Sequence, residues 1–338
     1  MRDRIKQNWW LGLLLLLPVM LLMGWSFRQF SWADLTAIFL ALHAGEIAIL
    51  LFINIAIFSL FTVRWQILLV SMGAKIGFYS LLAYRLVSFG ISYFTPGPQF
   101  GGEPAQVVLL KQKHGLPTEM ALSSVYLDRI IDLLVNLSVL VIGFFWLLAA
   151  GIMEDRAAVF QFWWVVLLVS LPAAHLFSLY FKKLPFSALL EWIGYRSKSQ
   201  RVTGWARVVH QSEARIGEYV QTRPQDFLKV LVVAAATWGL MILEYAVLLQ
   251  FLGLELPLTG VWVAVIAARL AFLTPLPGGL GALEAAQVAA MQLLQVNPAF
   301  GIGAAVIIRL RDVIFGCIGL GFGLWLLNKK DSIVEVKS

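Results

Sequence analysis

The sequence predicts an all-α polytopic membrane protein, built as an inverted repeat with about six full transmembrane helices and two re-entrant helical hairpins. Three observations predict this fold: the composition, the number of long apolar segments and a motif that occurs twice. Of the 338 residues, 60% are hydrophobic and only 13% are charged, whereas soluble domains carry about a quarter charged residues. So much apolar surface requires a bilayer, and it excludes a soluble enzyme.

Six apolar segments approach the roughly 20 residues that cross a hydrocarbon core. They are residues 9–27, 47–63, 133–153, 157–181, 227–252 and a last crossing that begins near Ile302 and ends at Leu327. Arg2, Arg4 and Lys6 precede the first segment, as in a signal peptide. Residues 23–27 offer no small-residue cleavage site, so we expect a retained first helix.

Basic residues collect in the segments that these crossings place on one side. They occupy the N-terminus, Lys75, residues 111–114, residues 182–223 and residues 329–330, whereas Arg28 and Arg156 are placed on the other side. The positive-inside rule therefore predicts a multi-pass protein of the bacterial cell inner membrane with both termini cytoplasmic. This topology accounts for the net charge of +7, so we expect no nucleic-acid partner.

Four regions follow from the same pattern. They are an N-terminal membrane half (1–181), a cytoplasmic connector (182–225), a C-terminal membrane half (226–328) and a cytoplasmic tail (329–338). In the connector, apolar residues recur at helical spacing: Trp205, Val208, Val209, Ile216, Tyr219 and Val220. This helix lies either on the anionic inner leaflet or against the cytoplasmic face of the protein.

One motif occurs in each half. In the first half, Thr-Pro-Gly-Pro at 95–98 precedes Gly101, Gly102 and Glu103, and Arg129 and Asp132 follow. In the second half, Thr-Pro-Leu-Pro at 274–277 precedes Gly278, Gly279, Gly281 and Glu284, and Arg309 and Asp312 follow. The crossings give the two copies opposite orientations, which is typical of transporters with inverted repeats.

Each copy interrupts an apolar stretch, at 78–112 and at 257–296. Irregular backbone at membrane depth is tolerated only where it is buried in protein or lines a polar cavity. We therefore predict two re-entrant hairpins whose tips approach the midplane. The tip residues are Pro96, Pro98, Gly101 and Gly102 in the first hairpin, and Pro275, Pro277, Gly278, Gly279 and Gly281 in the second.

Twelve ionisable residues lie in or beside the apolar segments, where each costs about 2.5 to 3.5 kcal/mol to insert. They are Arg64, Arg85, Glu103, Asp128, Arg129, Asp132, Glu244, Arg269, Glu284, Arg309, Arg311 and Asp312. We expect these groups to be paired or hydrated. Arg129 with Asp132 and Arg309 with Asp312 are each three residues apart, which places both side chains on one helical face, where a salt bridge can form. Two roles stay open: they clamp the hairpins, or they bind and gate a substrate. Glu244 pairs with an arginine or carries a proton.

The arginines suit an anionic headgroup, because guanidinium binds phosphate through two parallel hydrogen bonds. The chain has one cysteine, Cys317, which excludes a disulfide framework and a cysteine-based metal site. No metal or cofactor is expected. The sequence also lacks a zinc-protease helix, a phosphate-binding loop and a nucleophile elbow.

The motifs at 96–103, 128–132 and 276–284 resemble the lysylphosphatidylglycerol synthase transmembrane family, the flippase domain of the multiple peptide resistance factor. The resemblance implies a lipid translocase. No aminoacyl transferase domain follows Leu327, so we expect translocation without lipid synthesis.

The leading hypothesis is thus the movement of an anionic phospholipid, glycolipid or polyprenyl-phosphate-linked lipid between leaflets. One alternative is an intramembrane lipid-modifying enzyme that uses Asp128, Asp132 or Glu103 as its base. The other is an accessory scaffold that assists a lipid-biosynthesis enzyme as partner.

Overall fold

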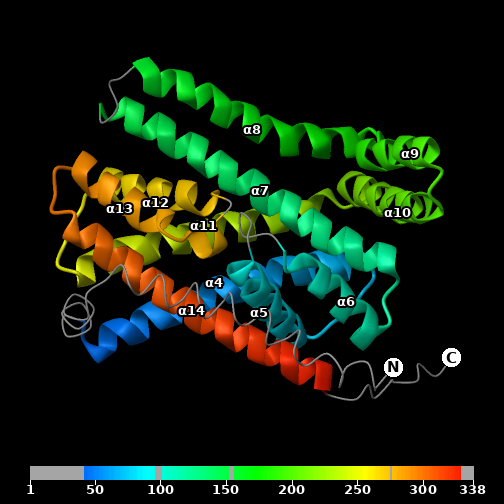
Figure 1. Cartoon of the computed structure of the whole chain (residues 1–338), viewed down its shortest axis with the longest axis horizontal. Coiled ribbons are helices and arrows are strands. Elements are labelled where there is room, and N and C mark those ends of the chain that lie inside the picture. The colour runs from blue at the N-terminus through cyan, green and yellow to red at the C-terminus, as the bar shows by residue number, and fades with distance from the viewer. Residues whose placement is uncertain (1–41, 96–100, 152–155, 275, 329–338) are drawn as a thin grey trace.

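The computed structural model describes residues 42–95, 101–151, 156–274 and 276–328, and over these residues it contains helices and no strand (Figure 1). The predicted all-α fold is therefore confirmed. Three of the described helices, α4 (Ala44–Ser71), α7 (Thr118–Ala149) and α11 (Pro224–Phe251), are long and apolar enough to cross a membrane. The predicted first crossing and the tip residues Pro96, Pro98 and Pro275 lie outside the described residues.

The remaining helices range from 12 to 30 residues. They are α5 (Phe78–Phe94), α6 (Glu103–His114), α8 (Arg156–Tyr180), α9 (Pro185–Ser197), α10 (Gln200–Thr222), α12 (Leu258–Phe272), α13 (Ala282–Leu293) and α14 (Ala299–Asn328), with a short 3-10 turn, η1 (Pro277–Gly279). The short helices pack in pairs, α5 with α6 and α12 with α13. In Figure 1 the second pair lies toward the end of the bundle opposite to α6, α9 and α10.

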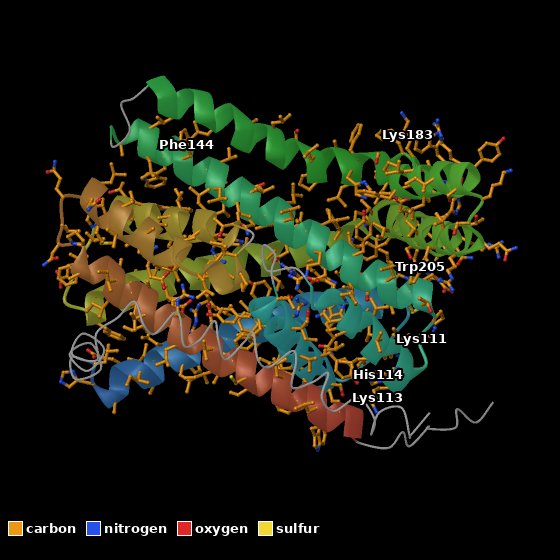
Figure 2. All side chains as sticks on the ribbon, in the orientation of Figure 1. Lys111, Lys113, His114, Phe144, Lys183 and Trp205 are labelled. Carbon is orange, nitrogen blue, oxygen red and sulfur yellow. The ribbon has the colours of Figure 1, made fainter. Side chains whose placement is uncertain are left out.

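The local sequence explains where α6 begins and ends. Glu103 and a proline occupy its first turn, where a carboxylate is favoured and a missing N–H does no harm. Lys111, Lys113 and His114 occupy its last turn, and Gly115 follows in the left-handed conformation that ends many helices. Figure 2 shows Lys111, Lys113 and Lys183 at the end of the bundle that α9 and α10 occupy.

The helices α4 and α11 end in the same way. Gly73 and Gly253, 180 positions apart in the sequence, follow these helices with φ values of 93° and 84°. The next amide donates back into the helix in both cases, Ala74 to the carbonyl of Leu69 at 2.8 Å and Leu254 to that of Leu249 at 2.9 Å. A shift of 180 positions therefore relates the two turns, residue by residue.

The helix contacts have the pairing that a two-fold relation between the halves requires. The contact of α5 with α14 corresponds to that of α7 with α12, and α6 packs on α7 as α13 packs on α14. The equivalent helices α4 and α11 contact each other directly. That the two repeats enter the membrane from opposite sides remains a prediction.

Glycines allow α5 and α14 to approach each other closely. A Cβ on Gly319 would lie 1.9 Å from the carbonyl oxygen of Leu86, and one on Gly90 would lie 2.6 Å from that of Gly316. Small residues let transmembrane helices approach in this way. The α5–α14 contact thus joins the first hairpin to the last helix of the second half.

The connector helix α10 packs on the protein. Ile216 and Tyr219 are buried in one apolar cluster with Leu127 and Ile131 of α7 and Leu179 of α8. This apolar face therefore lies against the protein, as one of the two interpretations of the sequence required. Trp205, at the other end of α10, is exposed.

Candidate functional site

A cavity of about 160 Å³ lies where the two halves meet. Three helices of each half line it, α4, α5 and α7 from the first and α11, α12 and α14 from the second. Lining residues occupy equivalent positions, such as Phe58 with Trp238 and Asp132 with Asp312, each pair 180 apart. At about 30 Å³ for each water of the liquid, this volume corresponds to roughly five waters, which is enough for a small polar group.

Seven of the twelve predicted residues line this cavity: Arg85, Arg129, Asp132, Glu244, Arg269, Arg311 and Asp312. The other five, Arg64, Glu103, Asp128, Glu284 and Arg309, do not line it and are joined to one another or to the lining residues by ion pairs. The structure therefore divides the predicted set into cavity residues and residues that position them.

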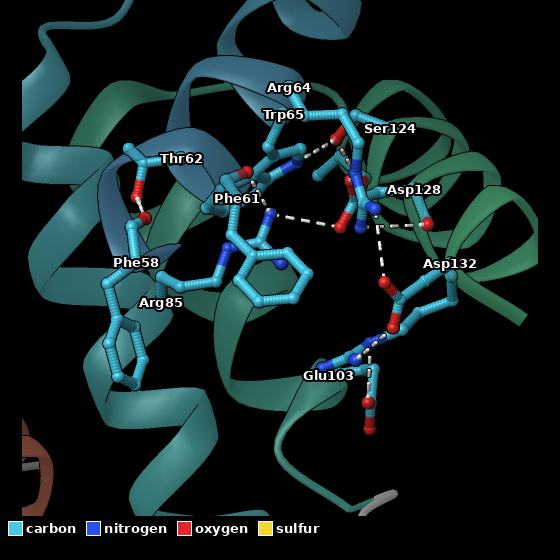
Figure 3. Close-up of polar contacts among 12 residues, drawn as sticks. Phe58, Phe61, Thr62, Arg64, Trp65, Arg85, Glu103, Ser124, Asp128 and Asp132 are labelled. Atoms are coloured by element: carbon cyan, nitrogen blue, oxygen red, sulfur yellow. Dashed lines mark hydrogen bonds and ion pairs between the residues drawn. The ribbon is translucent and has the colours of Figure 1, made fainter. Parts of the chain in front are cut away.

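In the first half, Asp128 is held between two arginines (Figure 3). Its two oxygens accept from Arg64 Nε at 2.7 Å and from Arg85 Nη2 at 2.9 Å. Arg64, with a side chain 1% exposed, also contacts Asp132 at 3.0 Å. Because a buried ion is stable only when its hydrogen-bonding groups are matched, this arrangement fixes α4, α5 and α7 together.

A glutamate–arginine pair ties the first turn of α6 to α7 and the first turn of α13 to α14. Glu103, the first residue of α6, contacts Arg129 Nε at 2.8 Å and accepts the Gly101 amide at 2.7 Å. Glu284 accepts two hydrogen bonds from Arg309, at 2.6 and 2.7 Å. The clamp role predicted for these four residues agrees with this geometry.

The second half contains a different group on the cavity wall, the Glu244–Arg311–Asp312 triad. Arg311 contacts Glu244 through Nη1 and Asp312 through Nη2, the latter at 2.8 Å. Asn54 of α4 donates to the same Glu244 oxygen at 2.9 Å. Glu244 therefore pairs with an arginine, as in one of its two predicted roles. That arginine, Arg311, also pairs with Asp312.

Arg269 differs from the other five arginines of the set. Among the described residues it has no carboxylate within ion-pair distance; its guanidinium stacks on Trp238, 4.7 Å from the ring centre, and Nη2 contacts Met241 Sδ at 2.7 Å.

The spacing Arg-x-x-Asp predicts the wrong ion pair in the second half, because Arg309 bonds to Glu284 while Asp312 bonds to Arg311.

Residues that line the cavity carry four buried polar atoms with neither a hydrogen-bond partner nor an ion-pair contact among the described residues: Arg85 Nε, Asn136 Oδ1, Tyr245 OH and Arg269 Nε. Arg85 is only 6% exposed and Tyr245 only 5%. Buried polar groups are nearly always hydrogen-bonded. Three of these four groups are donors, so the cavity offers hydrogen bonds to an acceptor such as an anion.

The sequence did not indicate four uncharged residues that also line the cavity, Asn54, Asn136, Trp238 and Tyr245. Neutral polar and aromatic side chains are common in transmembrane helices, so their presence carried no signal. Only the position of Tyr245 directly after Glu244 pointed to it.

Long apolar helices around a charged internal cavity define a polytopic α-helical membrane protein with a polar interior. The chain belongs to the lysylphosphatidylglycerol synthase transmembrane family, because the model of the lysylphosphatidylglycerol synthase TM region matches residues 9–319. It is also similar to a UPF0104 membrane protein of Methanothermobacter thermautotrophicus, 27% identical over 284 residues that cover 75% of this chain and 77% of the relative. No solved structure matches the chain. The resemblance to the family is thus confirmed, and the family is linked to lipid handling in membranes.

Proposed function

We propose that this protein is a lipid translocase that moves an anionic phospholipid, glycolipid or polyprenyl-phosphate-linked lipid between leaflets, with the headgroup passing through the cavity. The observation that carries the proposal is Arg269, a guanidinium on the cavity wall without a carboxylate partner among the described residues. A buried cation that no carboxylate contacts is expensive, so its retention on the cavity wall supports a site where an anion binds for part of the cycle.

The surrounding groups support the same ligand. Tyr245 OH and the Nε atoms of Arg85 and Arg269 are donors without a partner among the described residues, and all three residues line the same cavity. Arginine presents its donors in a planar fork that matches a phosphate group. The acyl chains need no site of their own in the protein, because they stay in the bilayer.

The enzyme alternative has less support. Both oxygens of Asp128 accept hydrogen bonds from arginines, and Glu103 is held by Arg129 and the Gly101 amide. Asp132, the third candidate base, contacts Arg64 at 3.0 Å and Arg129 at 3.7 Å. Each of the three carboxylates is therefore held by an arginine in this arrangement.

We infer the same membrane placement as the sequence predicts: a bacterial inner membrane, with the connector and both termini on the cytoplasmic side. The basic residues Lys111, Lys113 and Lys183 gather at the end of the bundle that α9 and α10 occupy (Figure 2). Positive charge marks the cytoplasmic side of membrane proteins.

The test is a flux assay in liposomes that contain the purified protein and a trace of fluorescent phosphatidylglycerol. Dithionite added outside bleaches only the outer leaflet, so translocation appears as loss of the protected fraction. The wild type should expose the inner-leaflet lipid, and Arg269→Ala should slow this at least ten-fold. Arg207→Ala, at an exposed position of the connector, is the matched control and should leave the rate unchanged.

Equal rates for wild type, Arg269→Ala and empty liposomes would refute the proposal. Mass spectrometry of the recovered lipid separates the alternatives, because an enzyme changes the mass of the lipid and a translocase changes only its leaflet. An altered mass in the wild-type sample would therefore favour the enzyme.

A further inference from the structure

The charges of the second half are unevenly placed. Glu244 and Asp312 both contact Arg311, so the triad of these three residues carries one formal negative charge in excess. Glu244 and Asp312 are each 6% exposed. A buried group with excess charge is stable only if a counter-charge or a proton compensates it.

Arg269 provides the opposite excess on the same cavity wall. It has no carboxylate at ion-pair distance among the described residues, so its positive charge and the excess negative charge of the triad offset each other without direct contact. Both belong to helices of the second half, α11, α12 and α14. With the cavity empty of lipid, the wall as a whole is therefore neutral.

The other ionisable residues that line the cavity are Arg85 and Tyr93 of α5, Arg129 and Asp132 of α7, and Tyr245 of α11. Arg129 and Asp132 contact each other at 3.7 Å, and Arg85 is bonded to Asp128. Asn54 is the polar group that α4 adds, and Glu284 of α13 is bonded to Arg309 of α14. Each nearby charge except Arg269 thus has an opposite partner.

We propose that the Glu244–Arg311–Asp312 triad binds one proton when an anionic headgroup binds Arg269, so that the protein takes up and moves headgroup and proton together. This inference rests on the proposed function. It adds how transport is coupled to an ion gradient.

The physical reason is the loss of the counter-charge. When the headgroup neutralises Arg269, the excess negative charge of the triad is no longer compensated, and the two carboxylates gain affinity for a proton. By thermodynamic linkage, a proton on the triad must then strengthen headgroup binding by the same factor. A monoanionic headgroup and one proton form a neutral pair, and an inward proton gradient drives that pair from the outer to the inner leaflet.

The experiment is titration calorimetry on the purified full chain in detergent, with dihexanoylphosphatidylglycerol as the probe. This phosphodiester stays ionised across the pH range used. At one pH, two buffers of different ionisation enthalpy should give different heats, and the difference reports about one proton taken up per lipid. Affinity should fall by up to ten-fold per pH unit as the pH rises, because the bound form holds the extra proton.

Glu244→Gln and Asp312→Asn each leave one carboxylate with Arg311, which makes the triad neutral. Both variants should bind the probe without proton uptake and with affinity independent of pH. If neither variant folds, the comparison of two buffers with the wild type still decides the question.

The outcomes separate the two proposals. Absence of probe binding, or equal binding by Arg269→Ala, would refute the proposed function together with this inference. Binding that depends on Arg269 but gives the same heat in both buffers would refute proton coupling alone.

Discussion

Arg309 donates two hydrogen bonds to Glu284, 2.6 and 2.7 Å long. Its Nη2 also donates to the carbonyl oxygen of Gly279 at 3.4 Å. This arginine therefore holds both the tip turn and the helix after it against α14. The equivalent pair in the first half, Arg129 with Glu103, is more exposed: the Arg129 side chain is 22% exposed and that of Arg309 only 3%.

The difference in burial predicts a difference in stability. Glu284→Ala leaves the buried charge of Arg309 without its partner, and breaking such a pair costs about 3 to 5 kcal/mol. Glu103→Ala should cost clearly less, because Arg129 is more hydrated and keeps Asp132 at 3.7 Å. Thermal unfolding in detergent measures both. The double variant Glu284→Ala with Arg309→Ala should recover part of the loss, and equal melting temperatures for the two single variants would contradict the clamp.

Arg269 should matter less for stability. Because no described carboxylate contacts it at ion-pair distance, Arg269→Leu breaks no ion pair, and the melting temperature is expected to fall much less than in a variant that breaks one. Arg64→Leu is the contrast, since it deprives Asp128 and Asp132 of a partner and should destabilise by about 3 to 5 kcal/mol. A large loss of stability in Arg269→Leu would show that this residue is structural.

The sequence predicted which charged residues meet but not which of them pair. Charges in apolar segments must find partners, and the twice-repeated motif indicated where. Helical spacing suggested Arg309 with Asp312, yet Arg309 bonds to Glu284 of α13 and Asp312 bonds to Arg311. Which carboxylate each arginine bonds to depends on how α13 packs on α14, and no local sequence pattern predicts that packing.

Helix lengths show a similar limit. The apolar pattern marked 47–63 as a crossing, whereas α4 runs from Ala44 to Ser71. Hydropathy indicates where lipid can surround a helix, and α4 continues past that region with Arg64 and Trp65 buried inside the protein. The ends of α4 and α11 could have been predicted more closely from Gly73 and Gly253, since glycine commonly follows the last turn of a helix.

The contact between α5 and α14 should tolerate a larger side chain at Gly321 but not at Gly319. In Gly319→Val the new Cβ would lie 1.9 Å from the carbonyl of Leu86, whereas nothing lies within 4 Å of a Cβ at Gly321. Overpacking costs about 1 to 3 kcal/mol or more. Gly319→Val should therefore lower the melting temperature and Gly321→Val should not, and equal effects would argue against this helix contact.

Glu213 ties the two connector helices together. It is 0% exposed and accepts the backbone amides of Phe186 and Ser187, at 3.0 and 2.9 Å, at the start of α9. Glu213→Ala leaves two amide donors unpaired, which costs about 1 to 3 kcal/mol for each buried group. Hydrogen exchange should then speed up in α9, whereas Glu218→Ala, at an exposed position of α10, should leave it unchanged. Unaltered exchange in the first variant would contradict this role.

The inverted repeat makes a prediction about two equivalent residues, Lys75 and Glu255, which lie 180 positions apart just after the turns that end α4 and α11. Both are exposed, and the predicted topology places Lys75 in the cytoplasm and Glu255 outside. In a Cys317→Ala background, Lys75→Cys should react with a membrane-impermeant maleimide only after the cells are opened, and Glu255→Cys should react in intact cells. Labelling of both from the same side would refute the inverted arrangement, because a parallel repeat would place the two turns on one face of the membrane.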